Sequence, residues 1–323
     1  MHRSTDDDPG LPATEPASQV AARLVDAVGT AIRGKTEVVR LSVSSLLAGG
    51  HLLLADAPGT GKTLLAKSLA AAIGGRFGRV QCTPDLLPSD LTGTSVYEPG
   101  AGSWSFRPGP VFANVLLVDE INRASPRTQA ALLEPMEERQ VTVDGASRSL
   151  PSPFLCIATQ NPNGQIGTFP LPESQLDRFA LVLSVGLPDR DAEREILTGT
   201  GGVGALARIG QVTTPRGVAA AIDEIGTVHC APAVIDYLLD LIAATRRHPD
   251  LTTGASPRAA VGLLAVSRAH AVICGRNYVT PDDVQALAVP SLVHRVAVGG
   301  RLDLAAAAVV IRGIVESIPA PRA

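Results

Sequence analysis

The chain has 323 residues, more than one compact core usually holds, so we expect two domains. Hydrophobic residues make up 45% and charged residues 18%, a globular composition that excludes a largely disordered chain. The formal net charge of −3 gives no electrostatic argument for nucleic-acid binding. No apolar run reaches the roughly 20 residues of a membrane-spanning helix, so we expect no membrane insertion.

Two features indicate the compartment. Residues 1–18 are rich in Asp and Pro and lack the basic-then-apolar order of a signal peptide, so we expect a disordered leader. Cys82, Cys156, Cys230 and Cys274 are scattered without metal-ligand spacing. We interpret them as buried small apolar side chains in a reducing environment, which predicts a cytoplasmic protein.

Short apolar runs alternate with helix-like stretches through residues 19–200. The runs expected to be strands are 51–55, 79–82, 114–118, 154–159 and 180–185. This alternation predicts an α/β core with a mainly parallel five-stranded sheet. Two hairpins, 94–106 and 141–150, interrupt it and turn at Pro-Gly and Asp-Gly sequences.

A glycine-rich stretch, residues 197–204, is interpreted as a flexible break between the two domains. Beyond it the apolar spacing is helical. Thr214, Ser256 and Thr280 each stand before a proline, the arrangement of a capping hydroxyl and a first helical residue. Residues 201–323 are therefore predicted to form a small all-helical lid domain.

The most informative motif follows the first predicted strand and opens a helix. Its residues are Asp56, Ala57, Pro58, Gly59, Thr60, Gly61, Lys62 and Thr63. The segment matches the P-loop pattern G-x-x-x-x-G-K-[ST], except that Asp56 replaces the first glycine. Such loops bind phosphates through backbone N–H groups and a helix N-terminus, with Lys62 on the β and γ phosphates and Thr63 on Mg²⁺. The chain lacks the Asn-Lys-x-Asp motif of GTP binding, so we predict ATP and Mg²⁺ as cofactors.

Polar residues follow two other predicted strands. Asp119 and Glu120 end the run 114–118, at the sheet edge where parallel sheets bind ligands. We expect Asp119 to hold Mg²⁺ through water and Glu120 to act as general base. Asn161 follows the run 154–159 and precedes a proline, so it is either a turn residue or a contact for the γ-phosphate or the attacking water.

Two arginines leave alternatives open. Arg178 ends a short helix, where a cation suits the helix dipole and a structural role is sufficient. Arg258 stands in the first turn of the helix that Ser256 caps, where a cation opposes the dipole by a few tenths to ~1 kcal/mol. A bound phosphate would offset that penalty.

Together these segments resemble the MoxR family of AAA+ ATPases. The resemblance runs from about residue 20 to residue 318 through motifs in the family's order: 57–63, 83–90, 119–124, 128–138, 158–162, 175–179 and 254–258. It implies that Asn161 is sensor 1, that Arg178 is an arginine finger reaching the neighbouring subunit, and that Arg258 is sensor 2. A finger shared between subunits implies a homo-oligomeric ring, which in this family is expected to be a hexamer. Pro135 interrupts the helix expected from Ser125.

The resemblance predicts an ATP-driven chaperone for maturation or assembly of a partner complex, including metal or cofactor insertion. It also implies a partner with a von Willebrand factor A domain and an unknown client protein. The alternatives are a regulatory switch without productive turnover and a magnesium-chelatase-like motor subunit. The aromatic residues of the first hairpin region are either cross-strand pairs or a client-binding surface: Tyr97, Trp104, Phe106 and Phe112.

Overall fold

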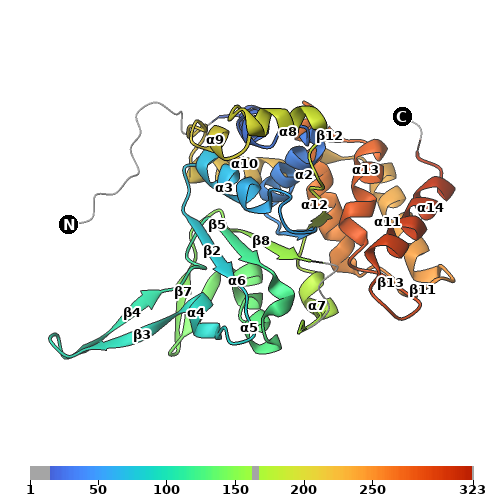
Figure 1. Cartoon of the computed structure of the whole chain (residues 1–323). Helices are drawn as coiled ribbons and strands as arrows, with labels where there is room; N and C mark the ends of the chain where they lie inside the picture. Colours follow the sequence, from blue (N-terminus) through green and yellow to red (C-terminus); the bar gives the residue numbers. More distant parts are fainter. Residues whose placement is uncertain (1–14, 162–166, 322–323) are drawn as a thin grey trace.

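The computed structural model describes residues 15–161 and 167–321 of the chain. Within these ranges, helices cover both faces of a central sheet, and a further group of helices lies beside it (Figure 1). None of the helices in the two ranges has the length and apolar character needed to cross a bilayer.

The five predicted strands form one parallel sheet in the order β2-β5-β8-β1-β9. They are β2 (Phe77–Gln81), β5 (Val115–Asp119), β8 (Leu155–Gln160), β1 (Leu52–Ala55) and β9 (Leu181–Leu183). Strand β5 is buried along its whole length, which explains why its sequence is continuously apolar rather than alternating. The strand order changes direction at β1, and open α/β sheets bind ligands at the carboxyl ends of strands at such a point.

Helices lie on both sides of the sheet. Those of the core are α1 (Ala17–Ala31), α2 (Thr36–Leu47), α3 (Lys62–Ala72), α4 (Pro88–Thr92), the 3-10 turn η1 (Ile121–Arg123), α5 (Pro126–Ala130), α6 (Leu133–Glu138), α7 (Glu173–Leu176), α8 (Arg190–Leu197) and α9 (Gly202–Leu206). Helix α3 packs on β5 and α2 on β9, whereas α5 and α6 lie on the opposite side (Figure 1). These layers confirm the predicted α/β class.

The range 1–18 predicted for the disordered leader overlaps a helix at its end. Helix α1 begins at Ala17, inside the range 1–18, while residues 1–14 lie outside the described part of the chain. Ala17, Val20 and Leu24 are buried against the core, so the apolar spacing of the helix already includes Ala17.

The helix predicted from Ser125 is broken into α5 and α6. Ala131 and Leu132 separate the two, three residues before Pro135. Because proline has no N–H and its ring clashes with the carbonyl four residues earlier, Pro135 excludes a continuous helix through Ala131.

Both predicted hairpins are present. They are β3 (Gly93–Glu98) with β4 (Ser103–Pro108), and β6 (Gln140–Val143) with β7 (Ala146–Ser149). The β3–β4 hairpin projects away from the body (Figure 1), and its register places Tyr97 opposite Trp104, with ring centroids 5.4 Å apart. The cross-strand interpretation of these two residues is therefore confirmed. Trp104 is still 71% exposed, and its role as a client contact stays a prediction.

The last part of the chain is helical, with two short strand pairs that the sequence did not predict. The helices are α10 (Pro215–Gly226), α11 (Pro232–Arg247), α12 (Pro257–Ile273), α13 (Pro281–Leu292) and α14 (Leu304–Ser317); the pairs are β10 (His229–Cys230) with β12 (Tyr278–Val279), and β11 (Leu251–Thr253) with β13 (Ala297–Val298). Helices α10, α12 and α13 begin at the predicted caps. Since α1 and α2 of the core also contact α10 and α12, a division at residues 200 and 201 stays a prediction.

Candidate active site

The predicted phosphate loop borders a cavity of about 540 Å³. All of its eight predicted residues except Ala57 line this cavity. Asp119, Glu120 and Asn161, from the ends of β5 and β8, line it as well. The fold thus brings six of the predicted functional groups into one space: the loop, Lys62, Thr63, Asp119, Glu120 and Asn161. Pro162, which follows Asn161 in the motif, lies outside the described residues.

The loop has the backbone conformation that its glycines permit. Gly59 and Gly61 have φ of 85° and 91°, in the left-handed region where a side chain is strained. Gly61 then caps α3, whose N-terminus presents unpaired N–H groups. The Lys62 ammonium donates to the carbonyls of Asp56 at 3.1 Å and Ala57 at 2.7 Å. A cation and a helix N-terminus therefore converge on the loop, which suits a phosphate group.

Asp56 anchors the loop to the segment after β9. Its buried carboxylate accepts hydrogen bonds from Ser184 Oγ at 2.7 Å, from the Val185 amide and from the Gly186 amide at 3.3 Å. An aspartate at the position of the pattern's first glycine therefore has a structural purpose. It ties the entrance of the loop to the chain beyond the edge strand.

Asp119 and Glu120 are organised by the neighbouring strands. Arg79 on β2 forms an ion pair with Asp119, Nε to Oδ2, at 2.8 Å. Thr159 on β8 donates to Asp119 Oδ1 at 3.3 Å and accepts from the Glu120 amide at 2.9 Å. Glu120 has φ of 54°, a conformation that non-glycine residues seldom adopt and that is concentrated at functional sites.

Two side chains that the sequence argument missed bind the Glu120 carboxylate. Gln81 donates to Oε2 at 3.1 Å and Arg123 donates to the same oxygen at 3.0 Å. Gln81 ends β2 and is paired in register with Asp119. Gln81 could have been identified from the sequence, because it is the polar residue that ends β2 and β2 lies next to the strand that leads to Asp119 and Glu120.

Part of the cavity lining is apolar and comes from α8 and α9, the helices at either end of the predicted break 197–204. Ile196 of α8 and Val203 and Leu206 of α9 line it. The segment 197–204 is thus mainly a tight turn between two helices, held by the amides of Thr200 and Gly201 on the Glu195 carbonyl. An apolar wall opposite a phosphate loop suits the base of a nucleotide, which needs stacking and dispersion contacts rather than charge.

Arg178 and Arg258 do not reach this cavity in the same chain. They line a second cavity of about 430 Å³, together with Glu137 and Arg139. Glu137 Oε2 forms an ion pair with Arg178 at 2.6 Å, and its Oε1 forms one with Arg258. These cations hold the pKa of Glu137 below its usual value, chiefly through the hydrogen bond from Arg258.

The expectation that a bound phosphate offsets the unfavourable position of Arg258 is not needed. The unfavourable position of Arg258 in the first turn of α12 is offset by Glu137 of the same chain, so it does not require a phosphate. In this structure neither Arg178 nor Arg258 lines the cavity beside the phosphate loop of its own chain.

One further cluster has metal-ligating atoms. His270, Cys274 and Asp283 approach one another, but Arg276 binds both oxygens of Asp283 at 2.6 Å. A guanidinium on the carboxylate opposes a second cation there, so we interpret the cluster as an ion-pair network around the buried Asp283 carboxylate. Cys274 is exposed, which makes the prediction of burial wrong for this cysteine; Cys82, Cys156 and Cys230 are buried as expected.

The comparisons with known proteins bear on this geometry. Residues 51–181 match the family described as "ATPase family associated with various cellular activities (AAA)", and residues 243–309 match the "AAA lid domain". Chaperone MoxR1 of Mycobacterium tuberculosis is 38% identical over 314 residues, which cover 93% of this chain and 82% of that protein. The chain belongs to the MoxR family of AAA+ ATPases.

Two more proteins are similar over nearly the whole length of this MoxR-family chain. YeaC of Bacillus subtilis is 40% identical over 301 residues, 93% of this chain and 94% of that one. The crystal structure of a candidate ATPase from Cytophaga hutchinsonii aligns with a TM-score of 0.84 at 34% identity, covering 95% of this chain and 96% of that one. These matches confirm the predicted P-loop core with a helical lid; the roles of individual residues stay predictions.

Proposed function

We propose that this MoxR-type ATPase hydrolyses ATP to ADP and phosphate. The observation that supports this most directly is the single cavity that joins the phosphate loop to Asp119, Glu120 and Asn161. Thr63 and Asp119 offer the hard oxygen ligands that Mg²⁺ prefers, and the loop with Lys62 offers N–H groups and a cation for phosphates. Mg²⁺, when bound, would neutralise charge on the β and γ phosphates.

In the proposed reaction a water oxygen attacks the γ-phosphorus as its bond to the β–γ bridging oxygen breaks. Glu120 accepts the proton of that water, and Asn161 orients the water or the γ-phosphate. Lys62 stabilises the negative charge that develops on the leaving ADP. Asp56 acts indirectly, by holding the loop in place through the chain after β9.

The positions of the two arginines support a site shared between subunits. Arg178 and Arg258 face a cavity that is separate from the phosphate loop, so a neighbouring subunit is the natural source of the nucleotide they would contact. We propose that both act on the neighbour's phosphates in a homo-oligomeric ring, which we expect to be a hexamer. An arginine finger typically contributes ~10³–10⁵ in rate, so a lone subunit should bind ATP and hydrolyse it poorly.

We further propose that hydrolysis drives remodelling of a partner, as the name Chaperone MoxR1 suggests for that relative. The expected partners are a protein with a von Willebrand factor A domain and a client whose maturation, assembly or cofactor insertion the ring assists. Cytoplasmic localisation stays part of this proposal. A nucleotide switch without turnover and a magnesium-chelatase-like motor subunit are the alternatives that the test must separate.

The test compares ATP binding with phosphate release in three variants. Lys62→Ala should lose ATP affinity and turnover, whereas Glu120→Gln should keep the affinity and lose turnover by about 100-fold or more. Lys35→Ala is the control, because the Lys35 ammonium donates to the Leu187 carbonyl away from the cavity. Its ATP affinity and turnover should match those of the unmutated protein. Binding of Mg·ATP without phosphate release at any protein concentration would support the switch and contradict the ATPase.

A further inference from the structure

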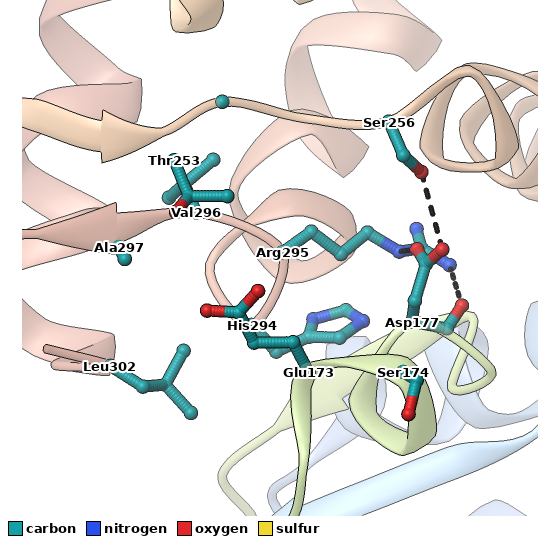
Figure 2. A pocket seen from close by; sticks show the side chains of 11 residues that line it. Glu173, Ser174, Asp177, Thr253, Ser256, His294, Arg295, Val296, Ala297 and Leu302 are labelled. Atoms are coloured by element: carbon teal, nitrogen blue, oxygen red, sulfur yellow. Dashed lines mark hydrogen bonds and ion pairs between the residues drawn. The ribbon is translucent and has the colours of Figure 1, made fainter. Parts of the chain in front are cut away.

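Three residues of the lid bind the segment that carries Arg178. Ser256 Oγ donates to Asp177 Oδ2 at 3.2 Å, and Arg295 Nε forms an ion pair with Asp177 Oδ1 at 2.9 Å. His294 Nε2 donates to the Phe179 carbonyl at 2.8 Å. Figure 2 shows Ser256 and Arg295 meeting at Asp177, with His294 nearby, in the lining of a cavity of about 200 Å³.

Arg295 binds the backbone on either side of Arg178. Its NH2 group donates to the carbonyls of Asp177 and Phe179, each at 3.0 Å. Its side chain is only 4% exposed, and NH1 is fixed by the Ser291 carbonyl at 2.9 Å. With NH1 and NH2 hydrogen-bonded and Nε within ion-pair distance of Asp177, the guanidinium has little rotational freedom, so it defines where the finger segment lies relative to α13.

His294 contributes as a neutral donor. Burial and the neighbouring Arg295 hold its pKa well below the usual value, so the ring keeps one N–H, and this N–H points at the Phe179 carbonyl. The contact is therefore present throughout the physiological pH range. Phe179 itself is buried in the core, which fixes the other side of the segment.

Asp177 also links Arg178 to Arg258. One carboxylate oxygen is bound to Ser256, which caps α12 through the Ala259 amide, and α12 carries Arg258. The other oxygen pairs with Arg295. A displacement of the lid would therefore move the backbone on both sides of Arg178 together with the helix that holds Arg258.

We propose that Asp177, His294 and Arg295 are positioning residues that fix the arginine finger to the lid, so that the lid of one subunit controls hydrolysis in the neighbouring site. This inference rests on the proposed sharing of the site between subunits. A shift of about 1 Å in a reacting group can lower a rate by ~10²-fold, so loss of these contacts should be visible in turnover. ATP binding by the subunit that carries the change should be unaffected, because none of the three residues lines its nucleotide cavity.

The experiment uses two inactive partners in a mixed ring. Glu120→Gln subunits supply a finger but no general base, and Arg178→Ala subunits supply an intact site but no finger. Their equimolar mixture should regain turnover. Asp177→Asn is then added to one partner at a time; it keeps the shape of the side chain but removes the charge that pairs with Arg295.

The expected result is asymmetric. In the Glu120→Gln partner, Asp177→Asn should lower the recovered turnover by about 10- to 100-fold; in the Arg178→Ala partner, whose finger is already missing, it should leave turnover unchanged. Arg295→Lys, which keeps the charge but not the planar fork, should show the same asymmetry. Equal losses from both partners would mean a purely structural role and contradict the proposal, as would no loss from either. A parent mixture without turnover would instead contradict the shared site itself.

Discussion

Arg178 and Arg258 bind opposite oxygens of one carboxylate, that of Glu137. The carboxylate allows two guanidinium groups from distant parts of the chain to lie close together despite their like charge. Removing it should leave two mutually repelling cations whose side chains separate. If both arginines act on one neighbouring nucleotide, their relative position matters more than either position alone.

We therefore predict that Glu137→Gln lowers ATP turnover by about 10- to 100-fold with little change in ATP affinity. The measurement is steady-state phosphate release together with an ATP-binding titration. Glu138→Gln is the matched control, because this exposed neighbour contacts Gln140 rather than an arginine. Turnover of Glu137→Gln equal to that of the unmutated protein would show that the shared carboxylate has no part in catalysis.

Asp56 should matter for stability before it matters for chemistry. Asp56→Ala leaves the Val185 amide, now bound by the carboxylate, without its partner in a buried position. An unsatisfied buried donor costs about 1–3 kcal/mol, and the midpoint of denaturant unfolding should fall accordingly. Ser184→Ala removes one donor but leaves the carboxylate its two amide partners, so its effect should be smaller. Equal midpoints for Asp56→Ala and the unmutated protein would exclude the anchoring role.

The apolar wall of the nucleotide cavity predicts a contribution to ATP affinity from residues outside the motifs. Val203 lines the cavity yet is 77% exposed, so Val203→Ser should not disturb folding. Full burial of a Val side chain contributes ~1.5–3 kcal/mol. Losing part of this contribution should raise the Kd for ATP by about three- to tenfold. Leu197→Ser is the control, because Leu197 is 87% exposed and does not line the cavity. If Val203→Ser and Leu197→Ser have the same Kd for ATP, Val203 does not contact the bound nucleotide.

Stability should fall in mild acid because His51 is buried as the neutral form. The Cys156 amide donates to its Nδ1, its Nε2 donates to the Met136 carbonyl, and burial together with Arg139 lowers its pKa from 6.5 to about 3. Between these two pH values the unfolded chain binds a proton that the folded chain does not. The free energy of unfolding therefore decreases as pH falls, by up to ~1.4 kcal/mol per pH unit for this group.

His51→Gln tests this dependence, since an amide side chain can replace both hydrogen bonds without titrating. We expect the unfolding midpoint of the unmutated protein to drop more between about pH 7 and about pH 5 than that of His51→Gln. Parallel pH profiles for the two proteins would mean that His51 does not contribute to the loss of stability in acid.

Local patterns in the sequence predicted most of the core and the phosphate site. The continuous apolar runs identify buried parallel strands, and Gly59, Gly61 and Lys62 stand in a spacing that few structures other than a phosphate loop require. The hairpin turns at Pro99 and Asp144 follow from turn chemistry alone. Each of these features depends on residues close together in the chain.

The features that the sequence did not reveal depend on residues far apart in the chain. Arg258 and Glu137 are far apart in the sequence and form an ion pair only in the folded chain. The position of Arg258 in its helix therefore could not reveal Glu137 as its partner. Ile196 and Val203 become a cavity wall only when the α8–α9 turn folds over the loop. Glycine-rich composition predicts a flexible segment, but a capped turn between short helices uses the same residues.

An active site completed by a neighbouring subunit can be detected by measuring ATP turnover per subunit as a function of protein concentration, for the unmutated protein and for Arg178→Ala. We predict that the specific rate of the unmutated protein rises with concentration as rings form, and that Arg178→Ala binds ATP normally but stays at least ~10³-fold slower at every concentration. A specific rate independent of concentration, with Arg178→Ala as fast as the unmutated protein, would mean that hydrolysis is completed within one chain.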